Sequence, residues 1–346
     1  MQLVVSHPYT AASTPSPRYE LVQVDGTTLT RGPSFDLGRT FLGEIVFTPD
    51  GQIGFVADDS GKLGVFRLTE SGPEVVYAQY AGAFYAAGVV MDPSGGSVYV
   101  QDVQWRENGG GVYALDIACD GSLSNERKLF DSKLPYGMAF DPQDPSRVLV
   151  YARDLGDSPS GEDVHLLSWG QQPVRSAGVR LFGDDEAQIS SLVMTHDARF
   201  ALVGDTAGFS SIPNRVGVAS VTQGGVAAAQ VLPDIEDPID LVTSPYNNAA
   251  LIISGFGERI LALDYEPTSA QPFTIRGEIS YSDAGPQLPG FAVSIDQGPL
   301  KGRVFIAENV GVRVLQFAED GDVTDLGVLS FGAGVEEALG SIGVVP

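Results

Sequence analysis

The sequence predicts an all-β fold, a seven-bladed β-propeller of four-stranded antiparallel blades, on three observations. A unit of short apolar runs recurs seven times along the 346 residues, turn-forming residues separate the runs, and helical periodicity is nearly absent. We expect a single domain over residues 1–346, because large all-β folds often reach this length as one domain.

Each unit holds an apolar run, a turn, a second apolar run that ends in a polar residue, and a third, alternating run. In the first clear copy, residues 44–47 lead into the turn Thr48-Pro49-Asp50-Gly51, and residues 53–57 end at Asp58. Pro presets φ and Gly permits positive φ, so such turns reverse the chain between short strands. The residues that close the second runs are His7, Asp58, Asp102, Arg153, Asp205, Gly255 and Glu308, spaced by 44 to 53 residues. That spacing is typical of propeller blades of about 40–50 residues.

The seventh unit is split between the two ends of the chain. Residues 341–345 would form its first strand, residues 3–6 its second and residues 19–24 its third. The N- and C-terminal strands would then close the last blade together. Two stacked β-sandwiches are the alternative, but they give no reason for seven matching copies with one of them split.

The charge balance of this chain limits the classes of partner that it can bind. It has 20 Lys and Arg residues against 44 Asp and Glu residues, a formal net charge of −24. Such a field repels nucleic-acid phosphates, and no run approaches the ~20 apolar residues of a membrane helix. We therefore expect no nucleic acid and no membrane insertion, and a monomer that binds a protein or a small-molecule ligand.

Cysteine usage and the N-terminus bear on the compartment. Cys119 is the only cysteine, so an internal disulfide is excluded. The first residues lack the basic and apolar regions of a signal peptide, so the protein is either cytoplasmic or has lost its signal. The Gly-rich, Lys-poor composition favours an extracytoplasmic protein, either periplasmic, secreted or a lipoprotein.

Polar residues follow the second strand of most units, which places them at one end of the blades. We expect ligand-binding residues there, namely His7, Asp58, Asp102, Trp105, Tyr136, Arg153, Asp205 and Glu308. The carboxylates of Asp58, Asp102, Asp205 and Glu308 are hard oxygen donors that suit Ca²⁺, with Arg153 as an internal counter-charge. Their alternative role is that of solvated residues at strand ends, and no cofactor is certain.

Three segments carry a family resemblance that covers essentially the whole chain. Phe-Thr-Pro-Asp-Gly ends at Gly51, Met-Asp-Pro-Ser-Gly ends at Gly95, and Val-Tyr-Val-Gln-Asp ends at Asp102. With the opening Val-Val-Ser-His-Pro-Tyr-Thr, the chain resembles the lactonase-type seven-bladed propellers. That group includes bacterial 6-phosphogluconolactonases, muconate-lactonizing enzymes and the YVTN-repeat proteins.

The resemblance implies catalytic residues, and this chain departs from the pattern. The resemblance implies a catalytic His in a Pro-His segment before the first strand of a blade. At the matching position this chain has Tyr136 after Pro135. Asp240 and Arg259 are the weak matches to the family's acidic residue and its Arg. General acid–base chemistry near neutral pH needs a titratable group such as His.

The departure makes a non-enzymatic binding or scaffold propeller our first hypothesis. In it, an acidic loop face is presented to a cation, a small ligand or a protein partner. The alternative is a lactonase- or esterase-type hydrolase at the mouth of the central channel, assisted by Ca²⁺ or not. A compact acid–base cluster or a buried metal at that mouth would favour the hydrolase.

Overall fold

The structure is a computed structural model of the whole chain. It describes all residues except 10–14, 27, 38–43, 59–61, 79–85, 104–109, 133, 154, 157–158, 160, 183–186, 207–212, 310 and 332–338. The candidate Trp105 lies outside the described residues, as does the side chain of Asp58.

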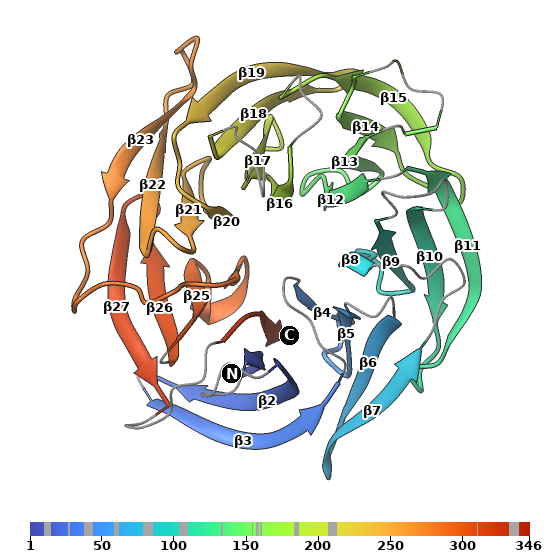
Figure 1. Cartoon of the computed structure of the whole chain (residues 1–346), viewed down its shortest axis with the longest axis vertical. Coiled ribbons are helices and arrows are strands. Elements are labelled where there is room, and N and C mark those ends of the chain that lie inside the picture. Colours follow the sequence, from blue (N-terminus) through green and yellow to red (C-terminus); the bar gives the residue numbers. More distant parts are fainter. Residues whose placement is uncertain are drawn as a thin grey trace. The chain divides into compact units, whose positions relative to one another are not determined.

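The described strands form seven four-stranded antiparallel sheets (Figure 1). The first sheet has the order β28 (Ile342–Val345), β1 (Gln2–Tyr9), β2 (Pro15–Asp25), β3 (Thr28–Asp36). The second holds β4 (Ile45–Phe47), β5 (Ile53–Asp58), β6 (Lys62–Thr69) and β7 (Gly72–Ala78). The third holds β8 (Ala86–Met91), β9 (Ser97–Asp102), β10 (Gly111–Ile117) and β11 (Leu123–Asp131).

The other four sheets also follow chain order. The fourth holds β12 (Leu134–Phe140), β13 (Arg147–Arg153), β14 (Val164–Ser168) and β15 (Val174–Val179). The fifth holds β16 (Ile189–Met194), β17 (Phe200–Asp205), β18 (Arg215–Thr222) and β19 (Gly225–Pro233). The sixth holds β20 (Pro238–Thr243), β21 (Ala250–Ser254), β22 (Arg259–Tyr265) and β23 (Phe273–Glu278). The seventh holds β24 (Ala292–Ser294), β25 (Arg303–Glu308), β26 (Gly311–Phe317) and β27 (Val323–Ser330).

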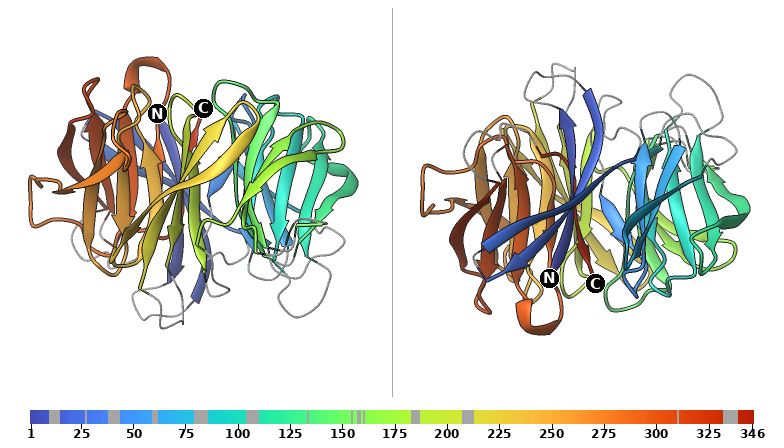
Figure 2. Two further views of the ribbon diagram at one scale, coloured as in Figure 1. Left: turned by 90° about the horizontal axis from the view of Figure 1, so that it is seen from above. Right: turned by 90° about the horizontal axis from the view of Figure 1, so that it is seen from below.

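These sheets confirm the predicted fold class, a seven-bladed all-β propeller. In the described part of the chain the only helix is a single 3₁₀ turn, Gly298–Leu300, so none is long and apolar enough to cross a membrane. The split blade is also confirmed, because β28 pairs antiparallel with β1 and Leu3 lies opposite Val344. The two chain ends lie side by side as a result (Figure 2).

The chain divides into two compact units. One comprises Met1–Pro135, Ala307–Val312 and Val328–Pro346, and the other Tyr136–Ile306 and Arg313–Gly327. The expectation of a single domain stays a prediction.

Within each unit the apolar residues lie between neighbouring sheets. In the first unit, Phe55 and Val65 of the second sheet pack with Val98 and Val100 of the third. In the second unit, one cluster joins the fourth and fifth sheets, one the fifth and sixth, and one the sixth and seventh. The sheets joined by these clusters therefore bury apolar faces against one another, because four strands alone cannot bury both of their faces.

The predicted turn chemistry is visible between the first and second strands of the sheets. In the β4–β5 turn, Gly51 adopts φ +69° and its N–H donates to Thr48 O at 2.8 Å, while the Asp50 carboxylate accepts the Gln52 N–H. In the β16–β17 turn, Ala198 takes the same left-handed conformation at φ +59°. A side chain is therefore tolerated there, at a cost that Gly would avoid.

Candidate functional site

The predicted ends of the second strands are confirmed. β5, β9, β13, β17 and β25 end at Asp58, Asp102, Arg153, Asp205 and Glu308, and Gly255 follows directly on β21. His7 lies two residues before the end of β1. The repeat therefore predicts the ends of the second strands correctly except in the first sheet, where β1 continues to Tyr9.

Three of the strand-end carboxylates are buried rather than solvated. Asp102, Asp205 and Glu308 are each 0% exposed. Asp205 accepts the Gln188 N–H at 2.8 Å and the Arg215 Nε–H at 2.9 Å. An ion pair with these hydrogen bonds satisfies a buried carboxylate. The counter-charge of Asp205 is therefore supplied by Arg215, a residue of the next strand.

The calcium site stays a prediction. Among the described residues, no three His, Cys, Asp or Glu side chains gather closely enough to hold a metal ion. Of the four proposed calcium ligands, Asp205 already forms an ion pair with Arg215. The side chain of Asp58 is not described by the structure.

Other predicted residues have ordinary structural surroundings. Tyr136 is half-buried on β12 and packs against the apolar cluster between the fourth and fifth sheets. Arg153 is half-buried at the end of β13. Arg259 begins β22 and lies at 36% exposure with Nη2 3.5 Å from Glu236 Oε2.

Asp240 is the most perturbed carboxyl of the predicted set. It is 2% exposed on β20, where its oxygens accept the backbone N–H groups of Ala292 at 2.9 Å and Leu241 at 2.8 Å. Burial raises its pKa to about 6, although these donors and the Ser191 hydroxyl favour the ionised form. Ser191, Asp240 and Ala292 lie on β16, β20 and β24, which are the first strands of the fifth, sixth and seventh sheets. The Asp240 carboxyl therefore links these three sheets.

A compact acid–base cluster lies in the first sheet, around His7. His7 Nε2 is 3.1 Å from Glu20 Oε2, and the two side chains are 1% and 2% exposed. Glu20 also accepts hydrogen bonds from Arg31, at 2.7 Å from Nε and 2.6 Å from Nη2, and from Arg18 Nη2 at 3.0 Å. Phe331 covers the cluster, with its ring 5.0 Å from Arg31 Cζ and 5.9 Å from the His7 ring.

Strand register brings these four polar side chains to one face. His7 lies opposite Arg18 in the β1–β2 ladder, and Glu20 is two residues further along β2. Paired residues and residues two apart share a face of a sheet. The β2–β3 ladder shifts register between Glu20 and Val22, and the shift pairs Arg31 with Val22 on that same face. The bulge thus aims Arg31 at Glu20.

The cluster fixes the protonation of its carboxylate. Burial alone would raise the pKa of Glu20, but the hydrogen bonds from His7 and Arg31 and the charge of Arg31 outweigh it and lower the pKa to about 2. Glu20 is therefore ionised throughout the physiological range. When a carboxylate accepts from Nε2–H, a neutral imidazole carries its lone pair on Nδ1. Glu20 thus selects the tautomer in which Nδ1 is the base.

A second buried histidine has different surroundings. His165 Nε2 donates to Ala152 O at 2.9 Å, and Nδ1 accepts from Arg175 Nε at 3.2 Å. Burial lowers its pKa. Because its Nδ1 accepts a hydrogen bond from a cation, His165 is held neutral and cannot serve as a base.

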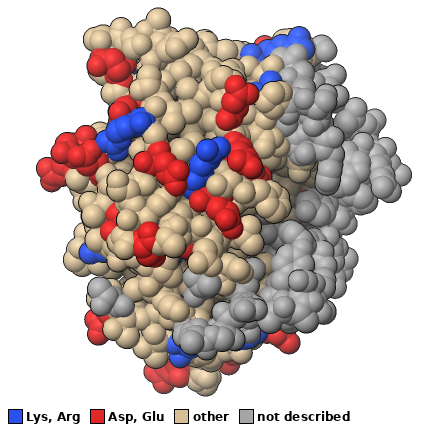
Figure 3. All heavy atoms as spheres, turned by 60° about the vertical axis from the view of Figure 1, so that its left-hand side comes forward, with Lys and Arg blue, Asp and Glu red and all other residues tan. Residues whose placement is uncertain are grey.

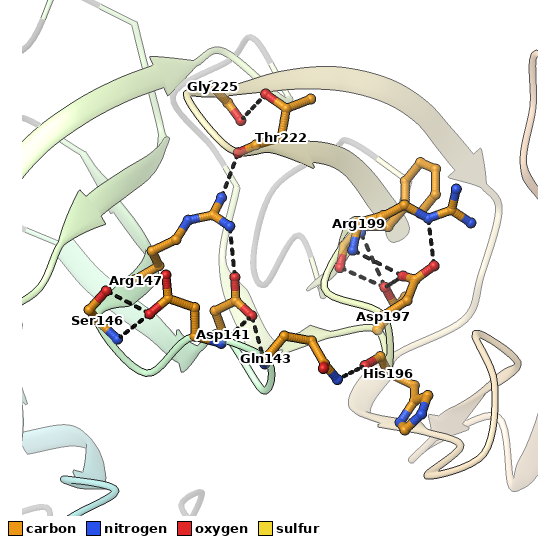
Figure 4. A network of polar contacts seen from close by, with 12 residues as sticks. Asp141, Gln143, Ser146, Arg147, His196, Asp197, Arg199, Thr222 and Gly225 are labelled. Carbon is orange, nitrogen blue, oxygen red and sulfur yellow. Dashed lines mark hydrogen bonds and ion pairs between the residues drawn. The ribbon is translucent and has the colours of Figure 1, made fainter.

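Turns at the other end of the fourth and fifth sheets carry a structural network (Figure 4). Asp141 pairs with Arg147, whose Nη2 donates to Thr222 O at 2.5 Å, and Gln143 Nε2 donates to His196 O at 2.9 Å (Figure 4). The bonds to Thr222 and His196 tie the fourth sheet to the fifth, whereas the Asp141–Arg147 pair lies within the fourth. Asp141 therefore has a structural role in its turn, and the exposed His196 takes part through its backbone oxygen.

His7 was among the predicted residues, but Glu20, Arg18 and Arg31 were not. Glu20 is a single carboxylate between apolar residues in the predicted strand 19–24, which is a signal that could have marked it as buried and paired. The sequence around Arg31 carries no such signal, because Arg31 reaches Glu20 only through the register shift in the β2–β3 ladder.

Comparisons with known proteins give the fold and no family. No family model and no curated protein matches the sequence. Solved structures do match: a protein of unknown function from Desulfotomaculum acetoxidans is 14% identical with a TM-score of 0.64, over 99% of this chain and 98% of that one. A candidate 6-phosphogluconolactonase from Bacteroides uniformis is 13% identical with a TM-score of 0.67, over 99% and 98%. The periplasmic gluconolactonase of Pseudomonas aeruginosa is 15% identical with a TM-score of 0.63, over 100% and 99%.

These similarities extend over the full length of the proteins compared. They confirm the expected likeness to lactonase-type propellers at the level of the fold. Fold likeness does not carry function, which depends on the site.

Proposed function

We propose that the chain is a hydrolase of lactones, with His7 as general base and Glu20 as the residue that orients it. The observation that carries this proposal is the buried His7–Glu20 pair, at 3.1 Å, with two arginines on the same carboxylate. A compact acid–base cluster favours the hydrolase over the scaffold, although this one extends from β1 to β3 and was expected at the mouth of the central channel. The full-length likeness to lactonase-named propellers supports the same choice.

The proposed reaction requires that water and the lactone gain access to His7, which is 1% exposed in this structure. Nδ1 of His7 then takes a proton from water as the water oxygen attacks the lactone carbonyl carbon. The resulting tetrahedral oxyanion collapses, the ring C–O bond breaks, and the leaving alkoxide takes the proton back from His7. The product is a hydroxy acid. Glu20 remains ionised and stabilises the transient imidazolium, as the carboxylate of a catalytic triad does.

The two arginines give the cluster a positive balance. Arg18 and Arg31 are 31% and 30% exposed, so their charge reaches solvent beside the buried pair. With Glu20 ionised, the two arginines and this carboxylate sum to +1 in a chain of net charge −24. This charge favours an oxyanion in the transition state and the carboxylate of the product.

Location and partners are part of the proposal. The periplasmic gluconolactonase supports an extracytoplasmic site of action, and the cluster supports a small-molecule ligand over nucleic acid. The scaffold hypothesis becomes the better one if no lactone is hydrolysed.

The test is hydrolysis of a panel of five- and six-membered lactones, including gluconolactone, followed by proton release with a pH indicator. We expect His7→Gln to lower kcat by about a hundredfold or more, the usual contribution of a general base. The control is His196→Gln, which alters an exposed turn residue and should leave the rate unchanged. Thermal melts of both variants separate lost activity from lost folding.

Two results would overturn the proposal: no rate above the uncatalysed one, or full activity in folded His7→Gln. Repeating the assay with Ca²⁺ and with a chelator tests the calcium prediction in the same experiment.

A further inference from the structure

Three loops at one end of the sixth sheet have unusual backbone and surface features. They are residues 234–237 before β20, residues 255–258 between β21 and β22, and residues 279–291 before β24. Among the described residues, six that are not glycine adopt a positive φ, and four of them lie here: Asp234, Asp237, Glu258 and Leu288. Such conformations are costly and persist where the surrounding structure holds them.

Hydrogen bonds fix the second of these loops to the first, and the third passes close to the second. The Gly255 N–H donates to Asp237 O at 3.0 Å, and the Phe256 N–H donates to Asp237 Oδ2 at 2.9 Å. A Cβ added to Gly255 would lie 2.6 Å from Asp237 Oδ2 and 3.5 Å from Pro289 O, so the third loop also passes close by. The β21–β22 turn is therefore held between its two neighbours.

The held turn presents a large apolar side chain to solvent. Phe256 is 79% exposed, the highest value among the exposed large hydrophobic residues described, and Leu288 on the adjacent loop is 42% exposed. A single exposed apolar residue is ordinary at a protein surface, but Phe256 and Leu288 are exposed on adjacent loops, and an aromatic ring on a fixed turn can serve as the anchor of a contact surface. A side chain that projects from a turn cannot enclose a small molecule, and it suits a peptide segment.

The surrounding charges indicate which peptide. Asp234, Glu236 and Glu258 are exposed on the first two of these loops, and Arg259, which pairs with Glu236, is the one basic residue that adjoins them there. A guanidinium or ammonium group can lie over an aromatic face while carboxylates pair with it. On the side of the molecule in Figure 3, however, acidic side chains are scattered widely. Charge alone would therefore not direct a basic segment to these loops, so the Phe256 ring must provide the specificity.

We propose that Phe256 and the three loops form a docking surface for an arginine- or lysine-bearing segment of a partner protein. An arginine side chain lies over the Phe256 ring, Leu288 contacts the aliphatic part of the segment, and the loop carboxylates pair with its charges. This surface shares no residue with the His7 cluster, so we expect lactone hydrolysis to be unaffected by its loss.

The experiment measures binding of a fluorescein-labelled twelve-residue peptide of alternating arginine and glycine, by anisotropy at about 0.15 M salt, where long-range charge effects are screened. We expect Phe256→Ala to weaken binding by up to about tenfold, the range of an aromatic–cation contact, and Phe256→Trp to retain it. Asp234→Asn with Glu236→Gln and Glu258→Gln should also weaken it.

The matched control neutralises three exposed turn carboxylates elsewhere, Asp120→Asn, Asp144→Asn and Asp320→Asn. Each accepts a backbone N–H two residues on, a bond that Asn keeps. Both triple variants change the net charge equally, and the control should bind as the wild type does. Equal weakening by the two triples, wild-type affinity in Phe256→Ala, or no binding at this salt concentration would each overturn the proposal.

Discussion

In the first sheet, Oε2 of Glu20 lies 3.1 Å from Nε2 of His7, and neither side chain is more than 2% exposed. A carboxylate buried to this degree must be paired, and here His7 and two arginines share it. The same contact has a chemical meaning, because it fixes the imidazole tautomer, and an energetic one, because it ties the stability of the sheet to pH.

The first prediction concerns Glu20→Gln and pH. The folded-state pKa of Glu20 is lowered from 4.5 to about 2. Its ionised form therefore stabilises the folded chain fully above about pH 4.5, and that stabilisation is lost as the pH falls through 2. We expect wild type to exceed Glu20→Gln in unfolding free energy at pH 6, with the gap closing toward pH 2. Urea melts across this range measure it, and a gap that does not change with pH would contradict the prediction.

Asp240 should show the opposite dependence. Its pKa is raised from 3.8 to about 6, so the folded state favours the protonated form. Its contribution is fully present below about pH 3.8 and is lost as the pH rises through 6, a change of about 3 kcal/mol. Relative to Asp240→Asn, wild type should therefore gain stability between pH 7 and pH 4. Denaturant melts of both proteins at four pH values check this, and parallel curves would count against it.

The fold could be predicted because repetition and turn chemistry are local. A turn such as Thr48 to Gly51 is encoded by four adjacent residues, and the same pattern at Asp92 and Asp141 fixes the strand boundaries. The paired terminal strands followed from the same spacing, since one unit lacked its first strand. No side-chain contact needed to be known.

The candidate site could be predicted only in part, because it depends on contacts across strands. His7 stood out as a strand-end residue, whereas Arg31 reaches Glu20 only through a register shift that the sequence does not announce. The strand-end carboxylates were expected to share a cation or face solvent. Asp205 instead is buried and pairs with Arg215, ten residues further along the chain.

The last prediction concerns Arg313, which is 0% exposed on β26. Its Nη1 lies 2.9 Å from Asp325 Oδ2, and its Nη2 lies 3.1 Å from Asp283 Oδ1. Arg313→Met would leave the buried Asp325 carboxylate without its cation, a change that typically costs about 3–5 kcal/mol. The measurement is the unfolding free energy from urea melts.

The control for Arg313 is an ion pair at the surface. Arg199 is 57% exposed and pairs with Asp197, so Arg199→Met should cost only about 0–1 kcal/mol. Adding Asp325→Asn to Arg313→Met should recover part of the loss, because it removes the uncompensated charge, while the single amide oxygen of Asn keeps an acceptor for one of the Ser282 and Gly327 N–H groups. If Arg313→Met costs no more than Arg199→Met, the buried pair does not hold the loop before β24 to β26 and β27.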